Sequence, residues 1–161
     1  MAGTNYWAMS LSDEWYTPKY IFDDLGLQFD LDVCSPGADK AYTPAKHHVV
    51  LPENGLEINW HGLIWCNPPY GKKNQAWYEK FKAHKNGLMF LTIAQMPTKK
   101  FTSLIEDIDG LLIYHKRVHL IDGTTGKRRQ SPGGSLLVAM GNRSIEAIKK
   151  STLGTVWIKN A

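Results

Sequence analysis

The stretch Leu63-Ile64-Trp65-Cys66-Asn67-Pro68-Pro69-Tyr70-Gly71 decides how the rest of the chain is interpreted. Its first four residues are apolar without alternation, which predicts a short strand buried on both faces. The two prolines fix the backbone φ angle at successive positions, so the strand is expected to end in a stiff loop. Asn67 and Tyr70 would then lie at a strand end, where open α/β sheets bind their ligands.

Further strands and helices are predicted on both sides of this stretch. Strands are expected over residues 29–34, within 42–51, and over 63–67, 88–94, 111–114, 136–140 and 155–158. Helices are expected over residues 18–25, 74–84, 98–108 and 145–150, the first and third capped by Thr17 and Thr98. This alternation predicts an α/β fold with a mostly parallel sheet and flanking helices.

Two features of the predicted strand and helix order indicate where a functional site could lie. The strand ends at Cys34-Ser35, Asn67 and Gln95-Met96 are expected to converge on one pocket. Residues 118–135 form a polar excursion, interpreted as a hairpin tipped by Asp122-Gly123. His47-His48 has no evident partner and is interpreted as part of a loop.

Length and composition set broad limits. A single domain is expected over residues 12–161, after a loosely ordered N-terminus over 1–11. With 19 Lys and Arg against 15 Asp and Glu, the net charge of +4 is compatible with a polyanionic partner. Two cysteines, Cys34 and Cys66, make no disulfide framework and favour a reducing compartment. We expect no signal peptide, membrane span or metal site.

The loop after residue 66 has the groups needed to activate an aromatic amine. The exocyclic amine of adenine is a poor nucleophile because its lone pair is delocalised into the ring. The side-chain oxygen of Asn67 and the carbonyl of Pro68 can accept its two hydrogens, which frees that lone pair. Tyr70 offers a stacking face worth about 1–3 kcal/mol, and a base in a duplex would have to be flipped out to reach it. The alternative is a merely stiff turn, since Pro-Pro pairs are common in loops.

Five segments, taken in order, carry a more specific signal. They are residues 12–18, 29–35, 55–60, 65–71 with Trp77, and 131–135. Together they resemble the phage-type DNA adenine N6-methyltransferases over residues 12–141. The resemblance implies a Rossmann-like class I methyltransferase fold with a reduced sheet, S-adenosylmethionine as methyl donor and double-stranded DNA as substrate. It also implies a phage origin and action in a bacterial cytoplasm.

The resemblance also assigns roles to individual residues. The catalytic tetrapeptide would be Asn67, Pro68, Pro69 and Tyr70. Contacts to the methyl donor would come from Tyr16, Thr17, Pro18, Asp32, Cys34 and Asn59. The chain departs from the family pattern in three places. It lacks a Gly-x-Gly loop after the first strand, Asn59 replaces an expected Asp, and residues 94–100 lack an expected Arg.

Three basic clusters are the candidates for contacts to DNA phosphates, namely Lys72-Lys73, Lys99-Lys100 and Lys127-Arg128-Arg129. A charge run is often only a solvated surface, which is the alternative here. Other functions stay open at this point: a methyltransferase of RNA adenine or of protein glutamine amides, or a catalytically silent nucleic-acid-binding relative. The recognised DNA sequence and a homodimer are open as well.

Overall fold

The computed structural model describes residues 14–69, 74–95, 98–131 and 133–160. The strands are β1 Trp15–Tyr16, β2 Phe29–Asp32, β3 Ala45–His48, β4 Ile64–Cys66, β5 Gly87–Thr92, β6 Gly110–Tyr114, β7 His119–Asp122, β8 Arg128–Gln130, β9 Ser135–Met140 and β10 Gly154–Ile158. The helices are α1 Lys19–Leu25, α2 Asn74–His84, α3 Lys99–Asp107 and α4 Asn142–Lys150, with a 3-10 helix η2 at Ile93–Gln95. The expected N-terminus over residues 1–11 lies outside the described residues.

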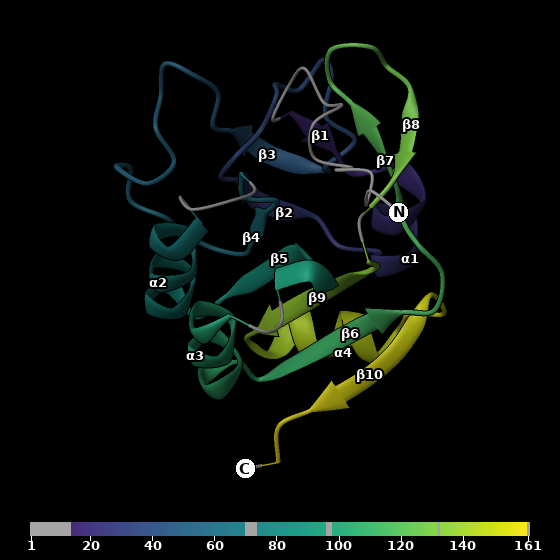
Figure 1. Ribbon diagram of the computed structural model, residues 1–161. Coiled ribbons are helices and arrows are strands. Elements are labelled where there is room, and N and C mark those ends of the chain that lie inside the picture. Colours follow the sequence, from purple (N-terminus) through teal and green to yellow (C-terminus); the bar gives the residue numbers. More distant parts are fainter. Residues whose placement is uncertain (1–13, 70–73, 96–97, 132, 161) are drawn as a thin grey trace.

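Seven strands form the central sheet, in the order β10-β6-β9-β5-β4-β2-β3 (Figure 1). β3, β2, β4 and β5 pair in parallel, whereas β9 is antiparallel to both β5 and β6, and β10 is antiparallel to β6. Five strands therefore run in one direction and two against it. The predicted α/β fold and its mostly parallel sheet are confirmed, and the antiparallel position of β9 between β5 and β6 is an addition to the prediction.

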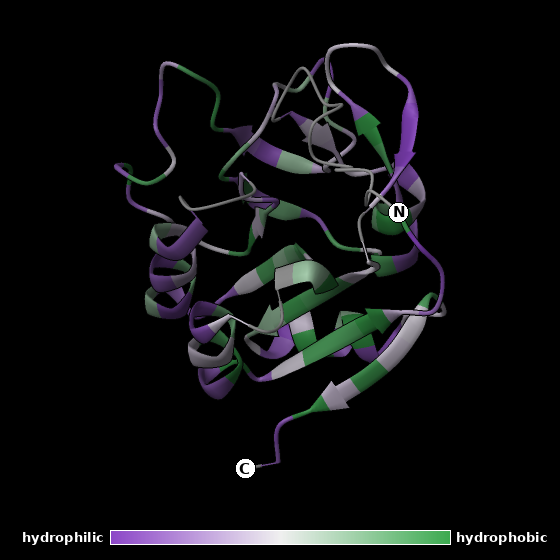
Figure 2. Cartoon of the chain, in the orientation of Figure 1, coloured by the Kyte–Doolittle hydropathy of each residue, from purple (hydrophilic) through white to green (hydrophobic). Residues whose placement is uncertain are grey.

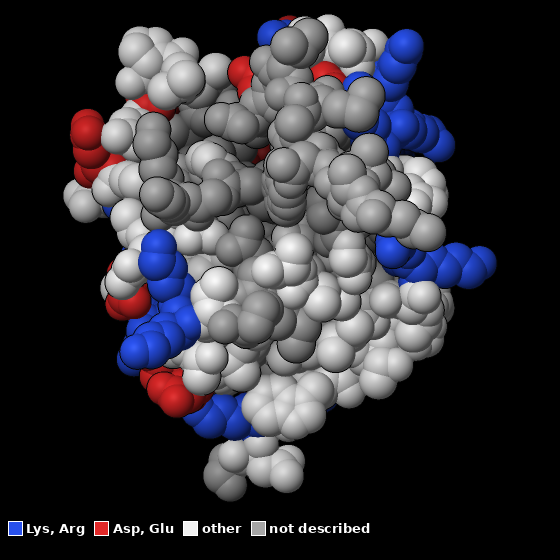
Figure 3. All heavy atoms as spheres, viewed as in Figure 1, with Lys and Arg blue, Asp and Glu red and all other residues white. Residues whose placement is uncertain are grey.

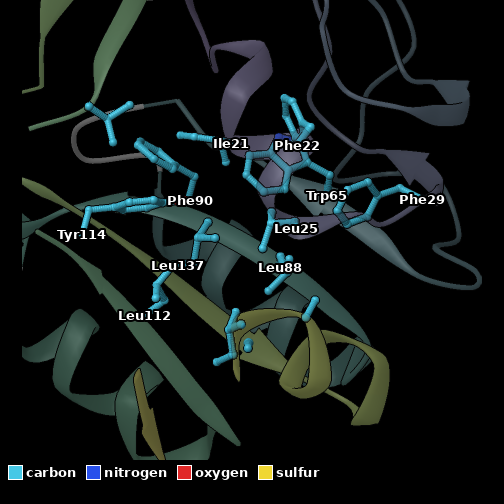
Figure 4. Packing of buried hydrophobic residues seen from close by; sticks show 14 of the residues in the cluster. Ile21, Phe22, Leu25, Phe29, Trp65, Leu88, Phe90, Leu112, Tyr114 and Leu137 are labelled. Carbon is cyan, nitrogen blue, oxygen red and sulfur yellow. The ribbon is translucent and has the colours of Figure 1, made fainter. Parts of the chain in front are cut away.

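Helices cover both faces of this sheet because the central strands are apolar on both sides (Figure 2). On one face α1 and α4 pack over Trp65, whose ring lies 4.8 Å from that of Phe22 and 5.7 Å from that of Phe29 (Figure 4). On the other face α2 and α3 pack over Ile64 and Cys66. The apolar run before Asn67 is buried on both faces, as predicted.

Of the two predicted helix caps, Thr98 is confirmed and Thr17 is wrong. Gly26 ends α1 in the left-handed region with φ +60°, which glycine adopts without a Cβ penalty. Thr98 caps α3 by accepting a hydrogen bond of 3.2 Å from the backbone N–H of Phe101. Thr17 does not cap α1. Pro18 occupies the N-cap position, and the Thr17 hydroxyl is buried without a hydrogen-bond partner in the described structure.

The polar excursion is a hairpin, as predicted, in which β7 and β8 are joined by a turn over residues 123–127. β1 was not predicted. It pairs with β7 to complete a second, three-stranded antiparallel sheet in the order β1-β7-β8 (Figure 1). Among the described helices, none has the length and apolar character needed to span a bilayer.

Candidate functional site

A cleft of about 270 Å³ opens where β2 and β4 end, near the lower limit of ordinary ligand pockets of roughly 300–1,000 Å³. Its lining comes from β1 with Glu14, from the loops after β2, β3 and β4, and from α2. The lining residues are Glu14, Trp15, Tyr16, Val33, Cys34, Ser35, Pro36, Val49, Leu51, Glu53, Asn54, Gly55, Asn67, Pro68, Pro69 and Trp77. The structure thus brings together the strand ends at Cys34-Ser35 and at Asn67. For the third expected strand end, only the backbone of Gln95 is described, and Met96 lies outside the described residues.

Asn67 is half-buried and its carboxamide is held in place by β1. The side-chain Nδ2 donates a hydrogen bond of 2.8 Å to the backbone carbonyl of Trp15. Because the amide nitrogen faces that carbonyl, the side-chain oxygen is directed away from it. Pro68 and Pro69 follow on the same wall of the cleft. Tyr70 falls outside the described residues, so its stacking role stays a prediction.

A smaller cavity of about 20 Å³, with room for about one water molecule, lies beside the cleft and shares Asn67 with it. Its other polar lining residues include Tyr16, Thr17, Asp32, Tyr42 and Thr43. The hydroxyl of Thr17 is buried here without a partner in the described part of the chain. A buried hydroxyl and a carboxylate on one small cavity form a suitable environment for a polar or cationic group.

Asp32 is 2% exposed, and this burial raises the pKa of its carboxyl to about 6. Hydrogen bonds from the side chains of Thr43 and Ser35 and from the backbone N–H of Cys34 act in the opposite direction, because they stabilise the carboxylate. Asp32 is therefore ionised at neutral pH, but at a considerable desolvation cost.

His48 is a site residue that sequence reasoning missed, and its interpretation as loop is wrong. It ends β3, and the parallel register of β2 and β3 places it opposite Asp32. Its Nδ1 lies 2.8 Å from the hydroxyl of Ser35 and 3.8 Å from Oδ2 of Asp32. Burial lowers the pKa of His48, so the imidazole is neutral at neutral pH and its contact with Asp32 is not an ion pair. The signal in the sequence was limited to the strand expected within 42–51, because the pairing of that strand with β2 is visible only in the structure.

The remaining residues expected to bind the donor differ in placement. Tyr16 lines both cavities, and its hydroxyl donates a 3.0 Å hydrogen bond to Glu14. Burial and that carboxylate raise the pKa of Tyr16 to about 12. Cys34 also lines both cavities, and burial raises its pKa to about 12, so its thiol stays protonated. Pro18 is buried and Asn59 is exposed, and neither is among the residues that line the two cavities.

On the face shown in Figure 3, Lys and Arg side chains lie in several separate groups and not in one continuous patch. Lys99 is exposed and Lys100 is half-buried at the start of α3, and Lys127 and Arg128 are exposed at the hairpin. Arg129 is half-buried, with its Nε 3.8 Å from Oδ2 of Asp122. Lys72 and Lys73 lie outside the described residues.

Within the described ranges, no three His, Cys, Asp or Glu side chains are grouped so that they could hold a metal ion. His115 and His119 have the four-residue spacing of a helical metal pair, but the segment that joins them is not helical. Cys34 and Cys66 are both free thiols.

Comparison with protein families gives a match over nearly the whole chain. The family model described as DNA N-6-adenine-methyltransferase (Dam) matches residues 6–156. That range includes the cleft, the hairpin and the four described helices. No curated protein and no solved structure gives a significant match.

Proposed function

The chain belongs to the DNA N-6-adenine-methyltransferase (Dam) family, and from that membership we propose that it transfers a methyl group from S-adenosylmethionine to N6 of an adenine flipped out of duplex DNA. The family establishes the coarser statement, a DNA adenine methyltransferase. The mostly parallel sheet with helices on both faces supports a Rossmann-like class I methyltransferase fold.

The observation that carries the proposal is the oriented carboxamide of Asn67 beside Pro68 on the wall of the cleft. The Asn67 oxygen and the Pro68 carbonyl would accept the two hydrogens of the adenine amine, which moves its nitrogen toward tetrahedral geometry. The nitrogen lone pair would form the new N–C bond as the S–C bond of the sulfonium breaks, which leaves a neutral thioether, and the proton released by the amine would pass to solvent. Neither residue forms a covalent intermediate. Tyr70 would hold the base by stacking.

The donor site proposed here includes Tyr16, Thr17, Asp32 and Cys34. S-adenosylmethionine supplies a methyl group activated by a sulfonium, and its amino-acid end carries an ammonium and a carboxylate. The small cavity has room for one group of the size of the ammonium, and its Thr17 hydroxyl without a described partner and its anionic Asp32 suit such a cation. These residues would bind and orient the donor, and the burial of Asp32 would strengthen its attraction to a cation.

Duplex DNA is the proposed partner, in a bacterial cytoplasm. Lys127 and Arg128 at the hairpin are exposed and can pair with phosphates, which position the duplex without reading its sequence. Lys99 and Lys100 at the start of α3 are proposed as a second contact. The structure gives no support to a donor contact by Asn59, because that side chain is exposed and is not among the residues that line the two cavities.

Transfer of a labelled methyl group to duplex DNA, RNA and protein in parallel tests the function. We expect transfer to adenine N6 in DNA by the wild type and a loss of at least about 100-fold in Asn67→Ala, because that variant lacks one of the two acceptors. Asn142→Ala, which removes an exposed carboxamide at the start of α4, is the matched control. Transfer to RNA or protein but not to DNA would overturn the proposal, as would full activity in Asn67→Ala.

A further inference from the structure

We propose that the hairpin of β7 and β8 holds the Asn67 carboxamide in its working orientation through β1, and that Gly123 is the positioning residue at this contact. The inference rests on the proposed function and deepens it. It assigns a catalytic support role to an element for which the sequence predicted only DNA contact.

β1 is fixed in place by its pairing with the hairpin. This strand is two residues long, and within the described residues its paired neighbour is β7, with Trp15 opposite Asp122 and Tyr16 opposite Ile121. The backbone N–H of Gly123 adds a hydrogen bond of 2.9 Å to the carbonyl of Glu14. The side chain of Trp15 packs at the margin of the core that α1 covers. The carbonyl that orients Asn67 therefore belongs to a strand whose backbone is set by the hairpin.

The hairpin turn is held by hydrogen bonds to Asp122. Oδ1 of Asp122 accepts hydrogen bonds of 2.9 Å and 3.1 Å from the backbone N–H groups of Thr124 and Thr125. The backbone of Asp122 exchanges further hydrogen bonds with Gly126 and Lys127. Lys127 and Arg128 follow directly on this turn (Figure 1). A duplex bound to these cations would thus be attached to the same stiff unit that supports β1.

Gly123 lies close to the side chains of Tyr16 and Glu14. A Cβ atom at this position would lie 2.7 Å from the Tyr16 hydroxyl oxygen and 2.8 Å from Cβ of Glu14. Cβ atoms essentially never come this close to other atoms, so the Tyr16 ring and the Glu14 side chain would have to shift, and both are attached to the backbone on either side of the Trp15 carbonyl. Gly123 does not have a positive φ, so its lack of a side chain serves this contact and not an unusual backbone conformation.

Gly123→Ala is therefore expected to displace the Tyr16 and Glu14 side chains and with them the backbone of β1, without removing a charge, a cleft side chain or a DNA contact. We expect the single-turnover rate of methyl transfer, at saturating donor and DNA, to fall about 10-fold, equivalent to roughly 1.4 kcal/mol of barrier. DNA affinity and its salt dependence should stay within about 2-fold of wild type, because the cations are unchanged. Thr124→Ala is the matched control, because this exposed residue lies in the same turn and the substitution adds no atom toward β1.

A second pair of variants keeps the test decisive if Gly123→Ala does not fold. Asp122→Ala removes the acceptor that fixes the turn, and Asp122→Asn retains one. The alanine variant should lose rate and the asparagine variant should recover most of it. A wild-type rate in Gly123→Ala, or a loss of DNA affinity with no loss of rate at saturation, would overturn the inference. Absence of transfer to DNA by the wild type would instead refute the proposed function.

Discussion

Replacing Asp32 by Asn is expected to stabilise the protein at neutral pH while weakening the binding of the methyl donor. Asp32 is 2% exposed, and burial raises the pKa of its carboxyl from 3.8 to about 6. A raised pKa means that the folded state binds its proton more tightly than the unfolded chain does. The stability that accompanies this proton is complete below about pH 4 and is lost as the pH rises through about 6.

The size of the effect follows from the two pKa values. A difference of about two units at 1.36 kcal/mol per unit corresponds to roughly 3 kcal/mol of folding free energy lost by the wild type above about pH 6. The carboxamide introduced by Asp32→Asn would carry no charge, but its NH₂ group cannot accept the hydrogen bonds that the carboxylate receives from Thr43 and Ser35. That mismatch costs about 1–2 kcal/mol at all pH values. The net gain at neutral pH is therefore about 1–2 kcal/mol.

Urea unfolding of the wild type and of Asp32→Asn between about pH 4 and pH 7.5 measures this difference. The stability of the variant minus that of the wild type should grow by roughly 2–3 kcal/mol across this range, most of it by about pH 6.5. Asp39→Asn, which removes the same charge from an exposed position, should show no comparable trend. Donor affinity should fall in Asp32→Asn alone. A stability difference that does not change with pH would refute the reasoning.

Two further predictions concern the basic residues of the hairpin and Gly55, which lines the cleft. Lys127→Ala and Arg128→Ala should each reduce the slope of log Kd for DNA against log salt by about one, as measured by fluorescence anisotropy, and unchanged slopes would remove the hairpin from the interface. Gly55→Ala should lower the unfolding temperature by several degrees or prevent folding, because its Cβ would lie 2.0 Å from the carbonyl oxygen of Val33 and 2.9 Å from Cη2 of Trp77. Wild-type thermal stability in Gly55→Ala would contradict the packing of that loop.

The elements that could be predicted from sequence are those with a strong local pattern. The uninterrupted apolar runs before Asn67 and around Met89 predicted β4 and β5, because only a strand with two covered faces is apolar at every position. Thr98 predicted the start of α3 through its capping bond. The position of β9 in the sheet could not be predicted from a local pattern. An apolar run indicates a strand, but not that it enters the sheet antiparallel between β5 and β6.

Short elements and long-range partners were missed for the same physical reason. β1 has two residues, too few to show a period of two, and its existence depends on pairing with β7 more than a hundred residues later. His48 gave no signal of its own because its meaning comes from the register of β3 against β2. That register places it against Ser35 and beside Asp32.

The residues proposed to act on the amine are adjacent in sequence, whereas the contact that orients Asn67 comes from a distant part of the chain. Asn67, Pro68 and Pro69 are adjacent in sequence, so the two proposed acceptors could be predicted from one tetrapeptide. The carbonyl that orients Asn67 comes from Trp15, 52 residues away, on a strand set by a hairpin near the other end of the chain. Under the proposed mechanism, a substitution at Asn67 would remove an acceptor, whereas a substitution at Gly123 would misalign an intact one. The single-turnover rate should therefore fall at least about 100-fold in Asn67→Ala and only about 10-fold in Gly123→Ala, and equal losses in the two variants would contradict this separation of support from chemistry.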